Sequence, residues 1–293
     1  MAQLTFRQRI FFGMGGLATA LPDMVFTQWI FVRYIKDDQS ALSPAAWFGI
    51  CFFAARVVGA LAEPMFGYWS DTFRSASGRR LPFIRRGMIP LVVSFFFLWL
   101  PPIGHVHWLN AAYAMLFMLG YLLSYPAVIT PYLALMPELT ADLRERVTLT
   151  TLQAVFIMIG TIAFAAMGAI LGWGGWLALG GTVSVLVFLT LLPIAITVRE
   201  KPSLDLGEGI GLWTSIRWTL ANRAFRHLAL STAFFLFAFN IIVMALPFWV
   251  KEYLGRDENT VTLLMAPLLG TTMLLFAGVG PLVARFGKYR LFT

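Results

Sequence analysis

The sequence predicts an all-α membrane protein, and three observations carry that prediction. Apolar residues make up 59% of the 293 residues and charged residues 12%, with a mean hydropathy of +0.77, whereas about a quarter of the residues in soluble domains are charged. Eight apolar runs reach the length of about 20 residues that a helix needs to cross a bilayer. The basic residues gather on one side of these runs. Strand-like alternation is not seen, which disfavours a lipid-facing β-barrel.

Six of the predicted helices follow one another closely, and two more come after a polar stretch. Their predicted ranges are 10–35, 45–68, 87–106, 109–136, 149–172, 175–197, 227–253 and 259–284. The first range is longer than the apolar core of a signal peptide and shows no convincing cleavage site, so we expect a retained helix.

The polar stretch after the sixth helix predicts a surface-bound linker. Within it, Leu212, Ile216 and Leu220 recur at helical spacing beside arginines, which is typical of an amphipathic helix lying on a membrane. The predicted organisation is a six-helix domain over residues 1–198, an amphipathic linker over 199–226, and the first two helices of a second domain over 227–293.

The net charge of +8 follows a pattern of membrane topology. With the N-terminus inside, seventeen of the 22 Lys and Arg fall on the inner side, four fall on the outer side, and Arg56 lies within a helix. This asymmetry is the positive-inside pattern. It predicts an integral protein of the cytoplasmic (inner) membrane with its N-terminus in the cytoplasm and without a nucleic-acid partner.

Enzyme and metal-site motifs are not recognisable in the sequence. Cys51 is the only cysteine, so a disulfide framework is excluded. His105 and His107 have no acidic or cysteine partner nearby, which disfavours a metal site. Without a catalytic triad or a phosphate loop, we expect no enzyme activity, no cofactor and no bound metal.

Three ionisable residues, Asp23, Arg56 and Glu63, lie well inside the first two predicted helices, although each costs about 2.5–3.5 kcal/mol at the centre of a membrane. At about 1.5 Å of rise per residue, Asp23 and Arg56 lie at one depth and Glu63 lies about 10 Å lower. We expect Asp23 and Arg56 to pair or to flank a water-filled cavity; the alternative is a purely stabilising ion pair. Glu63 either binds and releases a proton or is hydrogen-bonded to a neighbouring helix.

Two segments agree in order and spacing with a known family. The second helix ends as Arg56-x6-Glu63-Pro-Met-Phe-Gly67-x3-Asp71, followed by Ser75-x-Ser-Gly-Arg-Arg-Leu-Pro-Phe83. The fourth ends as Thr130-Pro-Tyr-Leu-Ala-Leu-Met-Pro-Glu-Leu-Thr140, followed by Asp142-x-Arg-Glu-Arg146. These segments resemble the glycoside-pentoside-hexuronide:cation symporters, the melibiose permease branch of the major facilitator superfamily.

The resemblance implies a fold of twelve helices in two parallel six-helix repeats. A faint internal repeat agrees, because residues 67–83 after helix two resemble residues 280–292 after helix eight. Eight of the expected twelve helices fall within the sequence, so we expect a C-terminally truncated member of the family.

The function implied by the resemblance is secondary active transport of a sugar, glycoside or uronate by alternating access. The alternatives are a carrier of lysolipids or other amphipaths, and a non-transporting membrane fragment. The sodium site of melibiose permease corresponds here to Gly59, Glu63 and approximately Ile129, of which Glu63 alone is acidic. Coupling to H⁺ or Na⁺ is therefore expected to depend on Glu63.

Sugar sites combine hydrogen-bonding side chains with aromatic platforms. The expected substrate-binding residues are Asp23, Trp29, Arg56, Tyr125, Gln153 and Asn240, and further candidates are Tyr121, Thr130 and Trp249. Each aromatic residue is alternatively an interfacial anchor or a packing residue.

The resemblance also implies a cytoplasmic gate. The alternative is that these charged residues only set the membrane topology. The expected gate residues are Asp71, Arg79, Arg80, Glu138, Arg144 and Arg146.

Overall fold

The computed structural model describes residues 4–35, 41–140, 142–198, 200 and 211–255, with the isolated positions 267, 270 and 271. These ranges contain eight long α-helices and no β-strand: α1 (Phe6–Ile35), α2 (Ala45–Thr72), α3 (Leu81–Leu98), α4 (Trp108–Leu139), α5 (Leu143–Ala165), α6 (Met167–Thr197), α7 (Leu212–Ala221) and α8 (Arg223–Glu252). Seven helices in the described part, α1 to α6 and α8, are long and apolar enough to cross a membrane. The predicted all-α membrane fold is confirmed, whereas the predicted helix 259–284 lies almost wholly outside the described residues.

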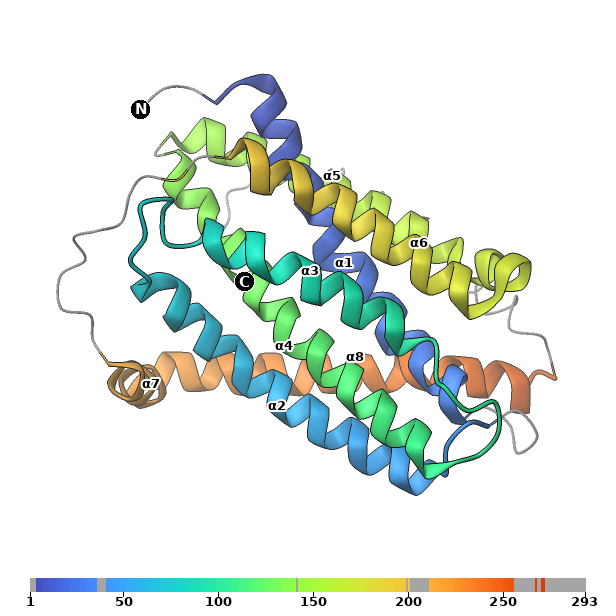
Figure 1. Ribbon diagram of the computed structural model, residues 1–293. Coiled ribbons are helices and arrows are strands. Elements are labelled where there is room, and N and C mark those ends of the chain that lie inside the picture. The colour runs from blue at the N-terminus through green and yellow to red at the C-terminus, as the bar shows by residue number, and fades with distance from the viewer. Residues whose placement is uncertain are drawn as a thin grey trace. The chain divides into compact units, whose positions relative to one another are not determined.

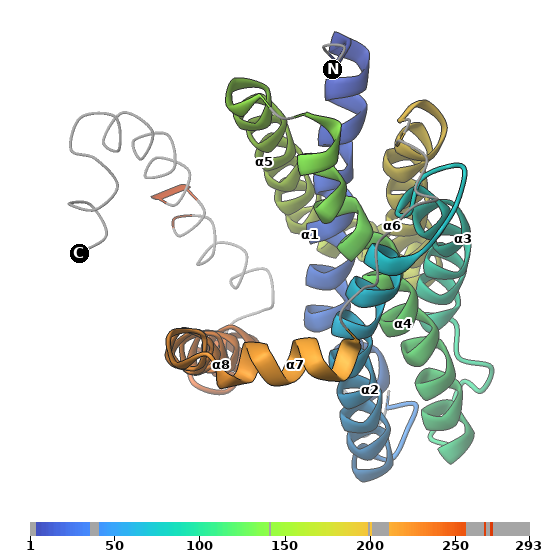
Figure 2. The same cartoon turned by 90° about the vertical axis from the view of Figure 1, so that its left-hand side faces the viewer.

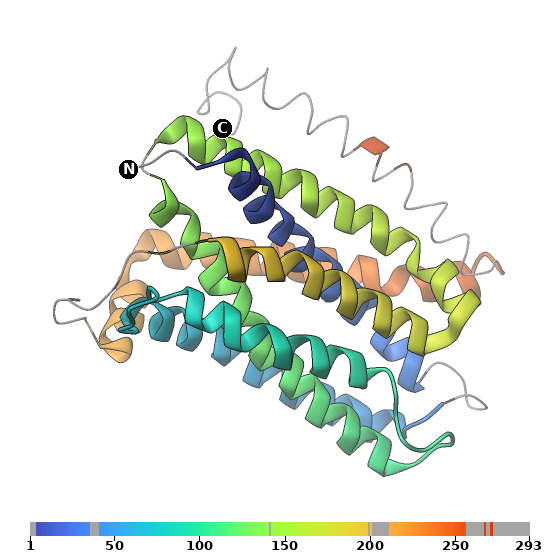
Figure 3. The ribbon, with the colours of Figure 1, turned by 45° about the horizontal axis from the view of Figure 1, so that its top comes forward.

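The chain divides into two compact units, Met1–Arg217 and Trp218–Thr293. In the first unit, α4 lies between α2 and α3, while α1 lies between α5 and α6 (Figures 1 and 2). Packing of α3 against α6 joins these two groups of three helices, as Figure 3 shows. Because α1, α3 and α5 start where α2, α4 and α6 finish, the first residues of α1 and the loop between α2 and α3 lie at one end of the bundle. We call this the N-terminal end.

Close packing between α1 and α5 depends on two glycines of α1. A Cβ atom at Gly13 would lie 2.8 Å from the Cβ of Leu152, and a Cβ at Gly16 would run into the backbone of Gln153. Small residues let helix backbones approach in this way, which is how helices associate where lipid supplies no hydrophobic driving force. The large side chains of the core, such as Phe12, Phe26 and Tyr121, are fully or almost fully buried.

Several helix boundaries differ from the sequence-based expectation, among them the end of α3 at Leu98 and the start of α5 at Leu143, and two of the differences have a clear physical reason. Helix α3 begins at Leu81, six residues before the predicted start, because Pro82 suits the first turn and Arg85 and Arg86 extend from the helix surface. The predicted boundary between 149–172 and 175–197 is also misplaced: α5 ends at Ala165, α6 begins at Met167, and Gly175 breaks the helical geometry inside α6 with φ 66°. No polar loop marks the turn at Ala166.

The predicted amphipathic helix corresponds to α7, none of whose residues is buried. Helix α8 begins at Arg223, where the side chain of Asn222 accepts a hydrogen bond of 3.3 Å from the backbone N–H of Phe225. Asn is a preferred N-cap because its side-chain oxygen satisfies such an unpaired N–H. The first turn of α8 therefore falls inside the stretch predicted as linker.

Candidate functional site

The guanidinium group of Arg56 lies at the contact between α1 and α2. Its Nη2 donates a hydrogen bond of 3.2 Å to Oγ1 of Thr27. The guanidinium carbon Cζ lies 4.8 Å from the ring centroid of Phe26 and 5.4 Å from that of Phe52. Cation–aromatic contacts of this kind contribute about 0.5–2 kcal/mol each, more where water is excluded. The arginine is thereby accommodated within a membrane-spanning helix without a carboxylate partner at ion-pair distance in the described chain.

Asp23 is an electrostatic neighbour of Arg56 rather than its ion-pair partner. The two charges interact, but Arg56 contacts Thr27, which lies one helical turn after Asp23 on α1. The sequence-based estimate that Asp23 and Arg56 lie at the same depth therefore agrees with the structure to within one helical turn, or about 6 Å. The expected direct pair is not formed in this structure, and a shared cavity around the two residues stays a prediction.

Two tyrosines of α4 complete the polar surroundings of Asp23. Tyr121 and Tyr125 pack against each other with ring centroids 5.6 Å apart, and both are electrostatic neighbours of Asp23. The hydroxyl of Tyr125 donates to the carbonyl of Thr19 at 2.5 Å. The hydroxyl of Tyr121, whose side chain is 1% exposed, has no hydrogen-bond partner. A buried hydroxyl without a partner costs free energy, which distinguishes Tyr121 from Tyr125.

The expected coupling residue Glu63 and the remaining substrate candidates lie at separate places. Glu63 is exposed on α2 and is an electrostatic neighbour of Tyr125. Trp29 packs edge-on against Trp176 with centroids 6.4 Å apart, and its buried Nε1 has no hydrogen-bond partner. Gln153 is buried on α5 beside Gly16.

The remaining candidates make local contacts. In the second unit, the exposed Asn240 donates to the carbonyl of Leu236 at 2.8 Å within α8, and Trp249 stacks on Tyr253 with centroids 6.0 Å apart. Thr130 is half-buried on α4. The roles expected of these residues stay predictions.

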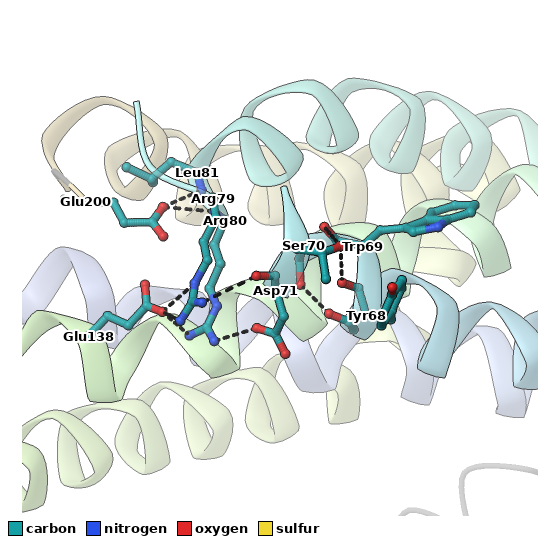
Figure 4. A network of polar contacts seen from close by, with 11 residues as sticks. Tyr68, Trp69, Ser70, Asp71, Arg79, Arg80, Leu81, Glu138 and Glu200 are labelled. Atoms are coloured by element: carbon teal, nitrogen blue, oxygen red, sulfur yellow. Dashed lines mark hydrogen bonds and ion pairs between the residues drawn. The ribbon is translucent and has the colours of Figure 1, made fainter. Parts of the chain in front are cut away.

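A network of charged side chains connects four segments at the N-terminal end of the bundle (Figure 4). Its members are Asp71 at the end of α2, Arg79 and Arg80 before α3, Glu138 at the end of α4, and Glu200 after α6. We call this set the terminal charge network.

Arginine–carboxylate contacts hold the network together. Nε of Arg79 donates to Oε1 of Glu138 at 2.8 Å, and its Nη2 contacts the same oxygen. Arg80 bridges two carboxylates, with Nη2 at 2.7 Å from Oδ1 of Asp71 and Nη1 at 3.3 Å from Oε1 of Glu138. Burial opposes the charge of Arg79, but the hydrogen bond and the charge of Glu138 outweigh burial and raise the pKa of Arg79. The ends of α2 and α4 are thus tied through one loop.

Glu200 adds the end of α6 to this network. Its Oε2 accepts hydrogen bonds from the backbone N–H groups of Arg80 at 2.9 Å and Leu81 at 3.1 Å, so it caps the start of α3. Gly78 adopts φ +90° beside it, and a Cβ on Gly78 would run into the Glu200 side chain. Burial and a hydrogen bond with the Glu138 carboxyl group raise the pKa of Glu200, against the lowering effect of the backbone N–H groups.

Arg144 and Arg146 do not join the terminal charge network in this structure. Arg146 donates from Nε to the carbonyl of Thr140 at 2.9 Å, while Arg144 is exposed on the first turn of α5. The carboxylate that is buried here is Glu145, which accepts from Oγ1 of Thr140 at 2.9 Å and pairs with Arg9 at 3.3 Å. Glu138 instead turns to the α2–α3 loop.

Sequence reasoning missed Glu200 and Glu145 because each is an acidic residue directly flanked by basic residues, Arg199 and Lys201 for Glu200 and Arg144 and Arg146 for Glu145. An acidic residue on the membrane side that carries mostly Lys and Arg is a usable signal of an ion pair, since basic partners lie nearby in the sequence. In the described residues no three His, Cys, Asp or Glu side chains gather as a metal site. His107 has a different role: its Nδ1 accepts a 3.1 Å hydrogen bond from the N–H of Leu109 at the start of α4.

Comparison with known proteins places these features in a family. Residues 11–293 match the model of a family described as MFS/sugar transport protein. The uncharacterized symporter sll1374 of Synechocystis sp. is 28% identical over 213 residues, which cover 68% of this chain and 38% of that protein. YagG of Escherichia coli, named as a candidate glycoside/cation symporter, is 25% identical over 243 residues, or 77% of this chain and 50% of YagG.

The name of a third relative gives a different transported molecule. The sphingosine-1-phosphate transporter MFSD2B of Mus musculus is 28% identical over 164 residues, which cover 54% of this chain and 31% of the relative. The chain therefore spans about a third to a half of the length of these three curated relatives. Because the family match extends over most of the sequence, and because the relatives include symporters, the chain belongs to the MFS/sugar transport protein family, in the glycoside-pentoside-hexuronide:cation symporter branch.

Proposed function

We propose that the protein acts in cation-coupled transport of a sugar, glycoside or uronate across the cytoplasmic membrane, by alternating access. The N-terminal end of the bundle faces the cytoplasm in this proposal, because the basic residues gather there. Residues 1–198 form the N-terminal transport domain, residues 199–226 the linker, and residues 227–293 the start of the second domain. Family membership supports transport, and the name of YagG supports a glycoside.

The observation that carries the proposal is the unpartnered hydroxyl of Tyr121 beside Asp23 and Arg56. All three belong to membrane-spanning helices, where ionisable residues mark substrate or ion pathways because their burial is costly. A carboxylate, a guanidinium and a hydroxyl supply both acceptors and donors, which is the chemistry that binds sugar hydroxyls. Phe52, which is half-buried beside Arg56 and stacks on the buried Phe26, offers apolar surface for the face of a sugar ring.

Coupling is assigned to Glu63, which is exposed on α2 below Arg56. A single carboxylate is a sufficient proton carrier, whereas Na⁺ is a hard cation that prefers several oxygen ligands. We therefore propose H⁺ as the coupling ion, with Na⁺ as the alternative. Transport by Glu63→Gln should lose its dependence on a pH gradient; uptake driven by a sodium gradient in the unchanged protein would contradict the choice of H⁺.

The terminal charge network is proposed as the cytoplasmic gate. Its contacts tie the ends of α2 and α4 to the start of α3, so movement of these helices relative to one another would have to break the pairs of Glu138 with Arg79 and Arg80. Arg144 and Arg146 take no part in those pairs here, and for them charge that sets topology is the simpler role.

The test is sugar transport by the full chain in proteoliposomes, with Tyr121→Phe compared against Tyr132→Phe. Tyr132 lies on the same helix, is equally buried, and donates to the carbonyl of Phe12 at 2.8 Å. Radiolabelled melibiose, xylose and glucuronate are the probes. We expect Tyr121→Phe to weaken uptake at least tenfold without loss of thermal stability, because its hydroxyl has no partner in the protein. Tyr132→Phe should lower stability by about 0.5–1.5 kcal/mol and leave substrate preference unchanged.

The second candidate function is transport of an amphipathic lipid, which the relation to MFSD2B favours. Sphingosine-1-phosphate and lysophosphatidylcholine are therefore included as probes. Uptake of these lipids without uptake of any sugar would overturn the carbohydrate assignment in favour of the amphipath. Failure to move any probe would favour a non-transporting membrane protein.

A further inference from the structure

Two adjoining cavities lie on the side of the bundle where α2, α3 and α4 meet the N-terminal end. The first cavity, of about 330 Å³, is lined mainly by apolar side chains that include Phe66, Pro90 and Leu123. The second, of about 240 Å³, is lined by Arg74, Ser75, Ser77 and Arg85. Both share Phe73, Pro82 and Arg86. They therefore form one continuous groove with a basic end and an apolar end.

The groove changes character along α3 in the direction of the bilayer. From Pro82, in both cavities, to Pro90, in the apolar cavity, the helix rises by about 12 Å. One leaflet contributes about half of the hydrocarbon thickness of about 30 Å, so this apolar length matches most of an acyl chain. At the junction, Phe73 and Phe83 meet edge to face with centroids 5.3 Å apart.

Two arginines of the basic end, Arg85 and Arg86, carry positive charge that no carboxylate of the described residues neutralises. Arg85 and Arg86 are both exposed. Nε of Arg85 donates to the carbonyl of Ala195 at 2.7 Å, which fixes the side chain and leaves its terminal nitrogens for another acceptor. Arg86 makes no hydrogen bond or ion pair with any described residue, and neither cavity is lined by a carboxylate.

The neighbouring carboxylates are already engaged elsewhere. Asp71 and Glu138 bind Arg80, and Glu200 occupies the backbone N–H groups at the start of α3. An anion near Arg86 would therefore meet two arginines and the serine hydroxyls of the loop. A soluble anion would use the basic end alone and would leave the adjoining apolar cavity without a role.

We propose that this groove binds an anionic phospholipid of the adjacent leaflet. Its phosphate contacts Arg85 and Arg86, and its acyl chain lies along the apolar cavity between Phe66 and Pro90. Basic pockets between membrane helices recognise anionic head groups by this combination of charge and apolar surface. The assignment goes beyond the proposed transport function and does not depend on it, since lipid binding is measured without a transported substrate.

The test measures binding of dioleoylphosphatidylglycerol to the purified full chain in detergent, by native mass spectrometry and by the shift in melting temperature. Dioleoylphosphatidylcholine and glycerol 3-phosphate are the comparison probes. A basic side chain near a membrane contributes about fivefold in affinity, so Arg86→Gln should weaken binding about fivefold and the Arg85→Gln/Arg86→Gln double variant about 25-fold. Arg86→Lys should retain most of the affinity, and Arg144→Gln, on α5, serves as the matched control with the same charge change.

Four results would overturn the assignment. Equal binding of the phosphatidylcholine would remove charge recognition, and an equal effect of glycerol 3-phosphate would indicate a site for a free anion. Equal affinities in Arg86→Gln and Arg144→Gln would move the lipid away from this groove. Since Arg86 has no partner in the described protein, its Gln variant should melt at the unchanged temperature without lipid; a lower value would assign Arg86 to the fold instead.

Discussion

Replacing Glu138 by Gln should destabilise the first unit, because Glu138 is the carboxylate that both network arginines share. The Arg80 side chain is 8% exposed and that of Glu138 is 23% exposed. Breaking a buried pair by removing one partner costs about 3–5 kcal/mol. Residual exposure of Glu138 and the remaining Asp71 contact reduce this loss, so we expect about 2–3 kcal/mol for Glu138→Gln.

The melting temperature of the purified full chain measures this effect. At about 2–4 °C per kcal/mol for a domain of 150–250 residues, the expected fall is about 4–12 °C. Asp71→Asn is the matched control: Asp71 also binds Arg80, but its side chain is 55% exposed, so its loss should cost about 0–1 kcal/mol. An unchanged melting temperature in Glu138→Gln, or an equal fall in both variants, would refute the reasoning that burial makes the Glu138 contacts strong.

Three further substitutions test separate parts of the packing. Gly78→Ala should cost at least about 1–2 kcal/mol, because a side chain is unfavourable at its φ of +90° and would displace Glu200; a melting temperature equal to that of the unchanged protein would contradict this. Glu200 has a raised pKa, so its contribution to stability should be full below its ordinary pKa of about 4.3 and should fall as the pH rises through the raised pKa; melting curves of Glu200→Gln should lack that dependence. Gly16→Ala should lower stability by about 1–3 kcal/mol through overpacking against α5, whereas Gly172→Ala, with open space around its Cβ, should not; similar melting temperatures would argue against close packing at Gly16.

The helical type of the fold and the seven membrane-length helices of the described residues followed from the sequence, because apolar length decides which segments cross a membrane. The boundary between α5 and α6 did not follow, since residues 149–197 form one apolar run and the turn at Ala166 carries no charge, proline or glycine. The start of α3 was placed late for the opposite reason. Arg85 and Arg86 indicated a loop, although long basic side chains can extend to water from the surface of a helix.

The candidate site was predictable in depth but not in detail. Helical rise placed Asp23 and Arg56 within one turn of each other, because depth depends only on position along each helix. Which side chain Arg56 contacts depends on helix rotation and tilt, and the choice of Thr27, Phe26 and Phe52 as its neighbours is visible only in the packed bundle. The lone hydroxyl of Tyr121 likewise has no counterpart in a sequence pattern.

The two arginine pairs of the α2–α3 segment differ in their contacts because they lie on different sides of one helix start. Arg79 and Arg80 precede α3, and their contacts with Glu138 are partly buried. Arg85 and Arg86 come within the first two turns of α3 and are exposed, while Leu81 and Ile84 face the core. Positive charge that looks uniform in the sequence is therefore divided by helix geometry into a part neutralised by the protein and a part left for its surroundings. Net charge alone could not separate the two parts.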